Sequence, residues 1–121
     1  MDINTYLVES EKTLSTNFNS NEKTERLLHG AIGIVTESGE LLDALKKKLY
    51  YGKELDVVNI KEELGDLMWY IAIILRELDF ELEDILDLNI SKLRSRYGET
   101  FLEHKALQRD LDTERAILED S

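Results

Sequence analysis

Hydrophobic positions recur every three or four residues along almost the whole chain, which is the spacing of amphipathic helices. The pattern predicts helices over about residues 2–15, 22–49, 56–78 and 82–97. A weaker pattern in the tail, RDLDTERAILEDS, predicts a last helix. No segment alternates between apolar and polar residues as a half-buried β-strand does. The chain is therefore expected to be all-α.

Residues that begin or end helices stand between these segments. Gly52 and Gly98 follow the second and fourth predicted helices, where a left-handed residue commonly closes a helix. Asp56 can cap the third helix, and the stretch Ser15 to Asn21 offers several N-caps. Short connections favour antiparallel neighbours. We expect one domain over residues 1–121, an antiparallel bundle of four main helices with a C-terminal helical tail.

The long second helix has two contrasting faces. One broad apolar arc is expected to form the core, and it comprises Leu27, Ala31, Ile34, Val35, Leu41, Leu42 and Leu45. The opposite, polar arc carries Glu37 and Glu40. Gly30, Gly33 and Gly39 lie inside this helix, where each costs about 1 kcal/mol relative to alanine. Such glycines indicate the close approach of a second backbone or of a ligand.

The third predicted helix combines an apolar stretch with two acids. Residues 67–76 carry no charge before the last, which indicates a buried helix. Asp66 stands at the head of this stretch and Glu63 lies one turn earlier, so both carboxylates need a donor, a proton or a cation. The same face continues with Trp69 and Tyr70. It indicates either a pocket with metal ligands at one end and an aromatic wall at the other, or a subunit interface holding a satisfied acid.

The two acid pairs share one spacing. Glu37 and Glu40 are three residues apart on the second helix, as are Glu63 and Asp66 on the third. Two helices that each offer two carboxylates can bind a hard cation such as Mg²⁺. Taken alone, Glu37 and Glu40 also match an ordinary solvated helix face.

The fourth predicted helix supplies positive charge. Asn89, Lys92 and Arg96 share one arc. Cations near a carboxylate cluster suit phosphate oxygens. Surface pairing with neighbours such as Glu81 or Asp84 fits the spacing equally well.

Charge and composition narrow the classes of partner. A net charge of −11 argues against a nucleic-acid-binding protein, whose footprint is basic, but leaves open a nucleotide held through cations. The absence of cysteine excludes disulfides and thiolate metal sites. No apolar run reaches the roughly 20 residues that cross a bilayer, and the first residues lack the pattern of a signal peptide. A cytoplasmic protein without a membrane partner is expected.

Several segments together resemble one known family. The succession Glu37-x-x-Glu40 and Glu63-x-x-Asp66 resembles the signature of the MazG-like all-α nucleoside triphosphate pyrophosphohydrolases. Four further stretches are similar to the helices and loop of that family: HGAIGIVTESGELLDALKK, YYGKELD, EELGDLMWYIA and NISKLRSRYGETF. The resemblance covers about residues 25–118.

The resemblance implies an activity and a set of site residues. Members cleave NTPs or dNTPs to the monophosphate and pyrophosphate with Mg²⁺, for which Mn²⁺ can substitute. Such hydrolases of acid anhydrides control or clean the nucleotide pool, and they assemble as homodimers or homotetramers. The implied metal ligands and catalytic residues are Glu37, Glu40, Glu63 and Asp66. The implied substrate-binding residues are Asn89, Lys92 and Arg96, and we add Trp69 for the base and Lys47 as a further phosphate cation.

The chain departs from the family pattern at two places. Thr36 stands where the family often has a glutamate, which leaves Glu37 to orient the water, with Glu62 as another contributor. Gly98 replaces a common proline and changes a turn. Two other functions remain open: a dUTPase- or dCTPase-type relative selective for pyrimidines, and a non-catalytic helical module that binds a metal structurally.

Overall fold

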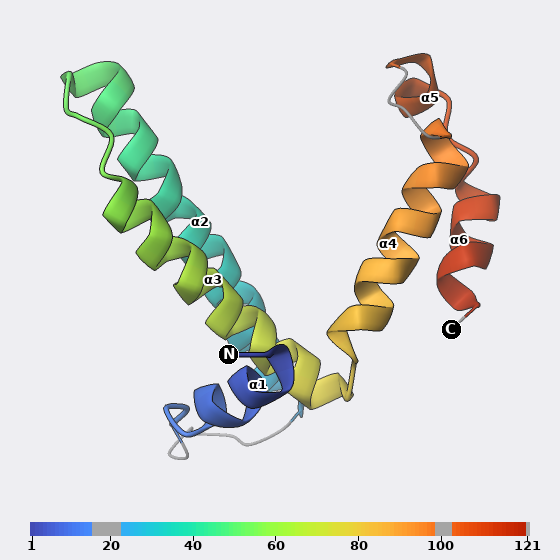
Figure 1. Ribbon diagram of the computed structural model, residues 1–121, viewed down its shortest axis with the longest axis horizontal. Coiled ribbons are helices and arrows are strands. Elements are labelled where there is room, and N and C mark those ends of the chain that lie inside the picture. The colour runs from blue at the N-terminus through green and yellow to red at the C-terminus, as the bar shows by residue number, and fades with distance from the viewer. Residues whose placement is uncertain (16–22, 99–102, 121) are drawn as a thin grey trace. The chain divides into compact units, whose positions relative to one another are not determined.

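The protein is helical in every part that the structure describes. The computed structural model describes residues 1–15, 23–98 and 103–120 (Figure 1). The helices are α1 (Ile3–Glu11), α2 (Lys23–Tyr51), α3 (Val57–Leu78), α4 (Leu82–Tyr97), α5 (Glu103–Leu107) and α6 (Leu111–Glu119). The all-α prediction is confirmed. None of the described helices is both long enough and apolar enough to cross a bilayer.

The predicted ends of the second, third and fourth helices agree with the local geometry, whereas the first helix ends at Glu11, before its predicted end at about residue 15. The Asp56 carboxylate accepts a hydrogen bond from the Asn59 N–H at 3.0 Å and so caps α3. Gly52 has φ 65° and Gly98 has φ 72°, in the region that favours glycine, and they close α2 and α4. Asp79 ends α3 in the same region, with φ 53°. The N-caps expected between Ser15 and Asn21 lie, from residue 16 onward, outside the described residues.

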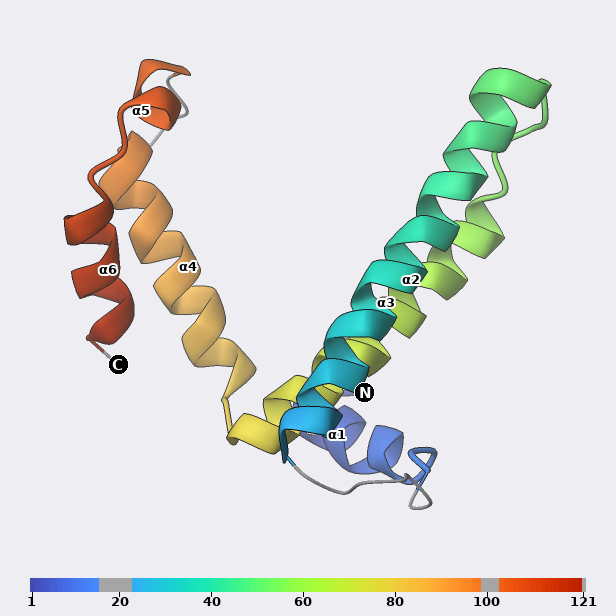
Figure 2. The same ribbon diagram turned by 180° about the vertical axis from the view of Figure 1, so that it is seen from behind.

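The helices group into two compact units. The first comprises Met1–Asp79 and the second Phe80–Ser121. In the first unit α2 and α3 run antiparallel, side by side, and α1 lies across the end remote from their connecting loop (Figures 1 and 2). In the second unit α6 packs beside α4. A single domain containing one four-helix bundle stays a prediction.

The face of α2 that packs on α3 differs from the predicted one. Gly30 and Gly33 are buried, whereas Val35 and Leu42 of the expected core arc are 71% and 67% exposed. A Cβ atom at Gly30 would lie 3.1 Å from the Tyr70 carbonyl oxygen, and one at Gly33 would overlap the Tyr70 ring. The core-arc prediction is therefore right only in part: Leu27, Ile34 and Leu41 are half-buried, and the other four residues of the arc are exposed. The reason is that α3 approaches α2 most closely where side chains are absent.

An apolar surface of α2 remains exposed as a result. We call it the outer face of α2, and it comprises Leu28, Ile32, Val35, Leu42 and Leu49. Gly39 lies on this face, and no other described side chain or helix comes within 4 Å of a Cβ built there. The core of the unit is supplied mainly by the second half of α3, where Ala72, Ile73 and Leu75 are buried. This agrees with the apolar stretch predicted for that helix.

Hydrogen bonds made by Arg76 and Tyr6 fasten α1 to α3. Arg76 Nη1 donates hydrogen bonds to the Leu7 carbonyl at 2.9 Å and to Ser10 Oγ at 2.8 Å. Ser10 is itself buried. Near the other end of α1, the Tyr6 hydroxyl donates to the Gly65 carbonyl at 3.5 Å. These bonds hold α1 against the face of α3 on which the acids and aromatic residues lie.

α6 is held on α4 by a buried carboxylate. Glu114 is 3% exposed and accepts from Arg96 Nε at 2.7 Å and from Arg109 Nη2 at 2.6 Å. Hydrogen bonds from Arg96, and then from Arg109, lower the pKa of Glu114 from 4.5 to about 2. The carboxylate must be ionised to make these bonds, so the contact depends on pH.

We expect acid to weaken the second unit through Glu114. Its pKa is depressed in the folded state, so its contribution to stability is complete above about pH 4.5 and is lost as the pH falls toward about 2. Thermal unfolding of the parent and of Glu114→Gln, followed by circular dichroism between about pH 6 and pH 2, measures this. The difference in melting temperature between the two proteins should shrink as the pH falls. A difference that does not change with pH would contradict the assignment.

Candidate metal-binding site and pocket

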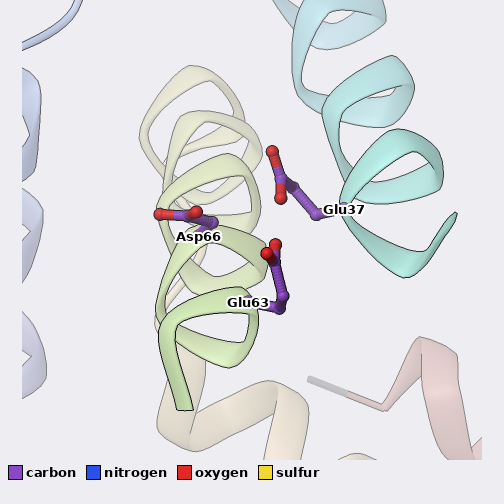
Figure 3. Close-up of side chains that lie close together, drawn as sticks. All are labelled: Glu37, Glu63 and Asp66. Atoms are coloured by element: carbon purple, nitrogen blue, oxygen red, sulfur yellow. The ribbon is translucent and has the colours of Figure 1, made fainter. Parts of the chain in front are cut away.

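Three carboxylates from two helices converge between α2 and α3. Glu37 comes from α2, and Glu63 and Asp66 come from successive turns of α3. One oxygen from each lies within 4.8 Å of the others, and Figure 3 shows Glu37 and Glu63 pointing toward one another. Two adjacent helices have thus brought three acids of the predicted set into one cluster.

Glu63 is the buried member of the cluster. It is 7% exposed, and its Oε2 atom is buried without a hydrogen-bond donor from any part of the chain that the structure describes. Hydrogen bonding with the Glu37 carboxyl raises the pKa of Glu63, and burial and the charges of Glu37 and Asp66 raise it further. Two carboxyls can bond in this way only by sharing a proton. Among the described residues, Glu63 Oε2 therefore has no hydrogen-bond donor.

Asp66 is placed differently from the prediction. The sequence pattern indicated that Asp66, at the head of the apolar stretch, and Glu63 both need a partner, but Asp66 is exposed and only Glu63 is buried. The reason is the register of α3, because Glu63 faces α2 while Asp66 turns toward an open pocket. The charge of Asp66 also reaches Tyr6 of α1, whose pKa is raised first by burial and then by Asp66.

The cluster fits a hard divalent cation. All three groups offer carboxylate oxygens, which Mg²⁺ and Mn²⁺ accept as ligands. A cation at this point would supply the partner that Glu63 Oε2 lacks and would relieve the repulsion among three acids. The three carboxylate ligands and the unsatisfied buried oxygen of Glu63 both fit a bound divalent cation.

A pocket of about 360 Å³ opens beside the cluster. Its lining combines acids, aromatic rings and a threonine: Thr13, Glu37, Asp66, Trp69 and Tyr70. The Trp69 and Tyr70 rings meet edge to face at 5.0 Å between centroids, and His29 lies edge-on to both. This volume suits a small organic ligand, with its charged part toward the acids and its flat part toward the rings.

Two residues of α2 predicted for the site lie apart from the cluster. Glu40, one turn beyond Glu37, is exposed and is not among the converging carboxylates of the described residues. The Lys47 amine pairs with Asp43 at 3.0 Å on the surface of α2. Both are on the same helix as Glu37, but the chain itself brings neither to the pocket lining.

The residues predicted on α4 belong to the second unit. Asn89 is exposed and Lys92 is partly buried. Arg96 is engaged with Glu114, and its guanidinium also lies 5.4 Å from the centre of the Tyr97 ring. Of the three, Arg96 therefore has a clear structural role in this unit.

Thr13 is the pocket residue that the sequence pattern missed. Its Oγ1 accepts a hydrogen bond from Trp69 Nε1 at 2.8 Å. The two residues are far apart in the sequence, and Thr13 follows a short helix whose apolar pattern says nothing about a ligand. Only the packing of α1 on α3 brings them together.

Comparisons with known proteins place the chain in a family. A family model described as the MazG nucleotide pyrophosphohydrolase domain matches residues 26–101, more than half of the chain. The chain is also 34% identical over 82 residues to the Gene 37 protein of Mycobacterium phage L5, covering 62% of this chain and 69% of that protein. No solved structure matches significantly.

The fold is all-helical, and the family match extends over α2, α3 and α4. Together they define an all-α protein of a nucleotide pyrophosphohydrolase family. The chain belongs to the MazG nucleotide pyrophosphohydrolase family.

Proposed function

We propose that this protein hydrolyses nucleoside triphosphates, NTP or dNTP, to the monophosphate and pyrophosphate, with Mg²⁺ or, in its place, Mn²⁺. The observation that carries the proposal is the carboxylate cluster, with its buried unsatisfied Glu63 oxygen, on the edge of a pocket with an aromatic side. Membership of the MazG family supports it. The reaction would serve to control or clean the nucleotide pool of the cytoplasm.

Glu37, Glu63 and Asp66 would hold the metal, and Glu40 would join them from the next turn of α2. When bound, the metal supplies positive charge for the phosphate oxygens and makes a water molecule more acidic. Magnesium keeps several waters, so a few carboxylates together with the substrate's phosphates complete its shell.

The chain's own groups would orient and activate the reactants. A Glu37 carboxylate oxygen would accept the proton of the attacking water while that water adds to the α-phosphorus. The bond from the α-phosphorus to the bridging oxygen breaks, and pyrophosphate leaves with that oxygen. Trp69 and Tyr70 would hold the base against the rings and keep solvent from that side of the pocket.

We expect Lys92 to bind the phosphates of the substrate and Arg96 to stabilise the second unit. We expect Lys92→Ala to lower kcat/KM at least about tenfold, a loss of about 1.4 kcal/mol in transition-state binding, with little change in melting temperature. The loss should be similar for all bases, because every substrate carries the same phosphates. Arg96→Ala should instead lower the melting temperature, since it leaves buried Glu114 with one fewer partner.

Arg94→Ala is the matched control, because Arg94 is an exposed cation of the same helix. It should change neither activity nor melting temperature. If Lys92→Ala is as active as the parent, α4 acts as scaffold, and the phosphate cations are to be sought in Lys47, Lys53 or Arg109.

A substrate panel tests the proposed reaction directly. NTPs and dNTPs, including oxidised and methylated bases, would be assayed for pyrophosphate release with Mg²⁺ and again after chelation by EDTA. We expect release that EDTA abolishes. Turnover confined to dUTP or dCTP would favour the pyrimidine-selective alternative. Metal binding without turnover of any nucleotide would overturn the catalytic proposal in favour of a structural metal-binding module.

We also propose that copies of the chain associate through the outer face of α2, as a homodimer or homotetramer. The side chains of this face are apolar and exposed, with Ile32 53% exposed and Leu49 75% exposed. Exposed apolar patches of this kind mark contact sites in proteins that are otherwise charged. Gly39, within the same face, leaves room for a second helix to approach closely.

A further inference from the structure

One wall of the pocket comes from a segment that the family match does not include. Thr13 lies just after α1, and the matched region begins at residue 26. Membership of the family therefore assigns no role to Thr13. Yet Thr13 lines the pocket together with Glu37, Asp66, Trp69 and Tyr70.

The Thr13 hydroxyl both donates and accepts a hydrogen bond within the protein. It donates its single proton to the Ser10 carbonyl at 2.9 Å and accepts the N–H of Trp69 at 2.8 Å. The Trp69 indole has one polar group, and this contact occupies it. Trp69 consequently presents only ring surface to the pocket, and its orientation is fixed at the N–H end by Thr13 and along the ring by Tyr70.

Thr13 is held in turn by α3. Arg76 Nη1 donates to Ser10 Oγ at 2.8 Å and to the Leu7 carbonyl at 2.9 Å, which anchors the turn of α1 that receives the Thr13 proton. Arg76 and Trp69 are seven residues apart, two turns along one face of α3. The C-terminal end of α1 is thus bonded to α3 twice, through Ser10 to Arg76 and through Thr13 to Trp69. The hydrogen bond from Thr13 to the Ser10 carbonyl links these two contacts.

We propose that Thr13 is a positioning residue for the nucleobase: it fixes the Trp69 indole and so determines which bases the pocket accepts. The inference rests on the proposed function, because it takes the pocket to hold the base of a nucleotide. With the indole N–H withheld by Thr13, the base meets a ring face and not a hydrogen-bond donor. Loss of the Thr13 hydroxyl frees that donor and unlocks the ring, so both the affinity and the order of preference among bases change.

The test compares Thr13→Val, which keeps the shape without the hydroxyl, with Thr13→Ser, which keeps the hydroxyl. Thr13 is exposed at its helix end, so neither change should disturb the fold, and circular dichroism checks this. Trp69 is the chain's single tryptophan, so its fluorescence reports on the pocket directly. The probes are AMP, GMP, CMP, UMP and dTMP, which bind without being hydrolysed.

We expect Thr13→Val to shift the Trp69 emission, to weaken the best-bound monophosphate at least about tenfold and to change the ranking of bases. Thr13→Ser should restore the parent's behaviour. In the steady state, Thr13→Val should raise KM for the preferred triphosphate with little change in kcat. A role confined to holding α1 in place would leave the ranking of bases unchanged.

The outcomes separate this inference from the proposed reaction. Unchanged affinities and ranking in Thr13→Val would overturn the inference even if pyrophosphate is released. Failure of every monophosphate to alter Trp69 fluorescence would also overturn it. Base-dependent binding that changes in Thr13→Val, in a protein that releases no pyrophosphate, would support the positioning role and contradict the proposed hydrolysis.

Discussion

Replacing Glu63 by glutamine should reduce Mg²⁺-dependent pyrophosphate release by at least about a hundredfold while leaving the helices intact. Glu63 is the buried carboxylate of the cluster, and its Oε2 has no donor among the described residues. Glutamine keeps the shape but removes the charge that a cation needs. Its amide can also donate to Glu37, so the metal-free variant should melt at the same temperature as the parent or higher.

Glu62→Gln is the matched control for this experiment. Glu62 is adjacent in sequence but exposed, and it is not one of the converging carboxylates. It should retain near-normal activity and stability, whereas Asp66→Asn should lose activity as Glu63→Gln does. Near-normal turnover in Glu63→Gln, or an equal loss in Glu62→Gln, would show that the metal site has been assigned to the wrong residues.

Gly33→Ala should destabilise the first unit by about 1–3 kcal/mol, the usual cost of forcing an extra group into a packed contact. A Cβ at this position would overlap the Tyr70 ring, and Tyr70 both lines the pocket and contacts Trp69. Thermal or denaturant unfolding measures the loss. Activity should fall too, because the ring can escape the added methyl group only by moving.

Two variants show whether the clash with Tyr70 is the cause. Apart from its chain neighbours and the local α3 backbone, no described group lies within 4 Å of a Cβ built at Gly65, so Gly65→Ala should be neutral or stabilising by up to about 1 kcal/mol. In a Tyr70→Leu background, Gly33→Ala should cost clearly less than it does in the parent, which a double-mutant cycle measures. Additive effects in that cycle would contradict the contact.

The helix boundaries and the acid cluster were accessible from the sequence because both depend on local spacing. Asp56 and Gly52 act through their own turns of the chain, so their residue types suffice to place the ends of α3 and α2. Glu63 and Asp66 are one turn apart on one helix, so their proximity follows from helical geometry. Bringing Glu37 to them required more than the packing of α2 beside α3 as neighbours joined by a short loop. It also required that the arc of α2 holding Gly33 and Glu37, not the more apolar arc, face α3.

The rest depended on contacts that no local pattern encodes. Periodicity identified Val35 and Leu42 as an apolar face, but it could not tell whether that face meets α3 or another surface. The glycines determine which face of α2 packs on α3. The close approach of Tyr70 at Gly33 is made in preference to packing by the larger side chains of the other arc. Arg96 was predicted to bind phosphate, yet its bond partner, Glu114, lies two helices further along the chain.

The exposed outer face of α2 links the conformational stability of the protein to its concentration. If copies associate there, each bound copy stabilises the folded state by mass action, and that gain grows with the logarithm of chain concentration. Dilution would then act as a mild denaturant, lowering the melting temperature even though no contact within a single chain has changed. Leu42, 67% exposed in the single chain, would be a core residue in a concentrated solution and a surface residue in a dilute one.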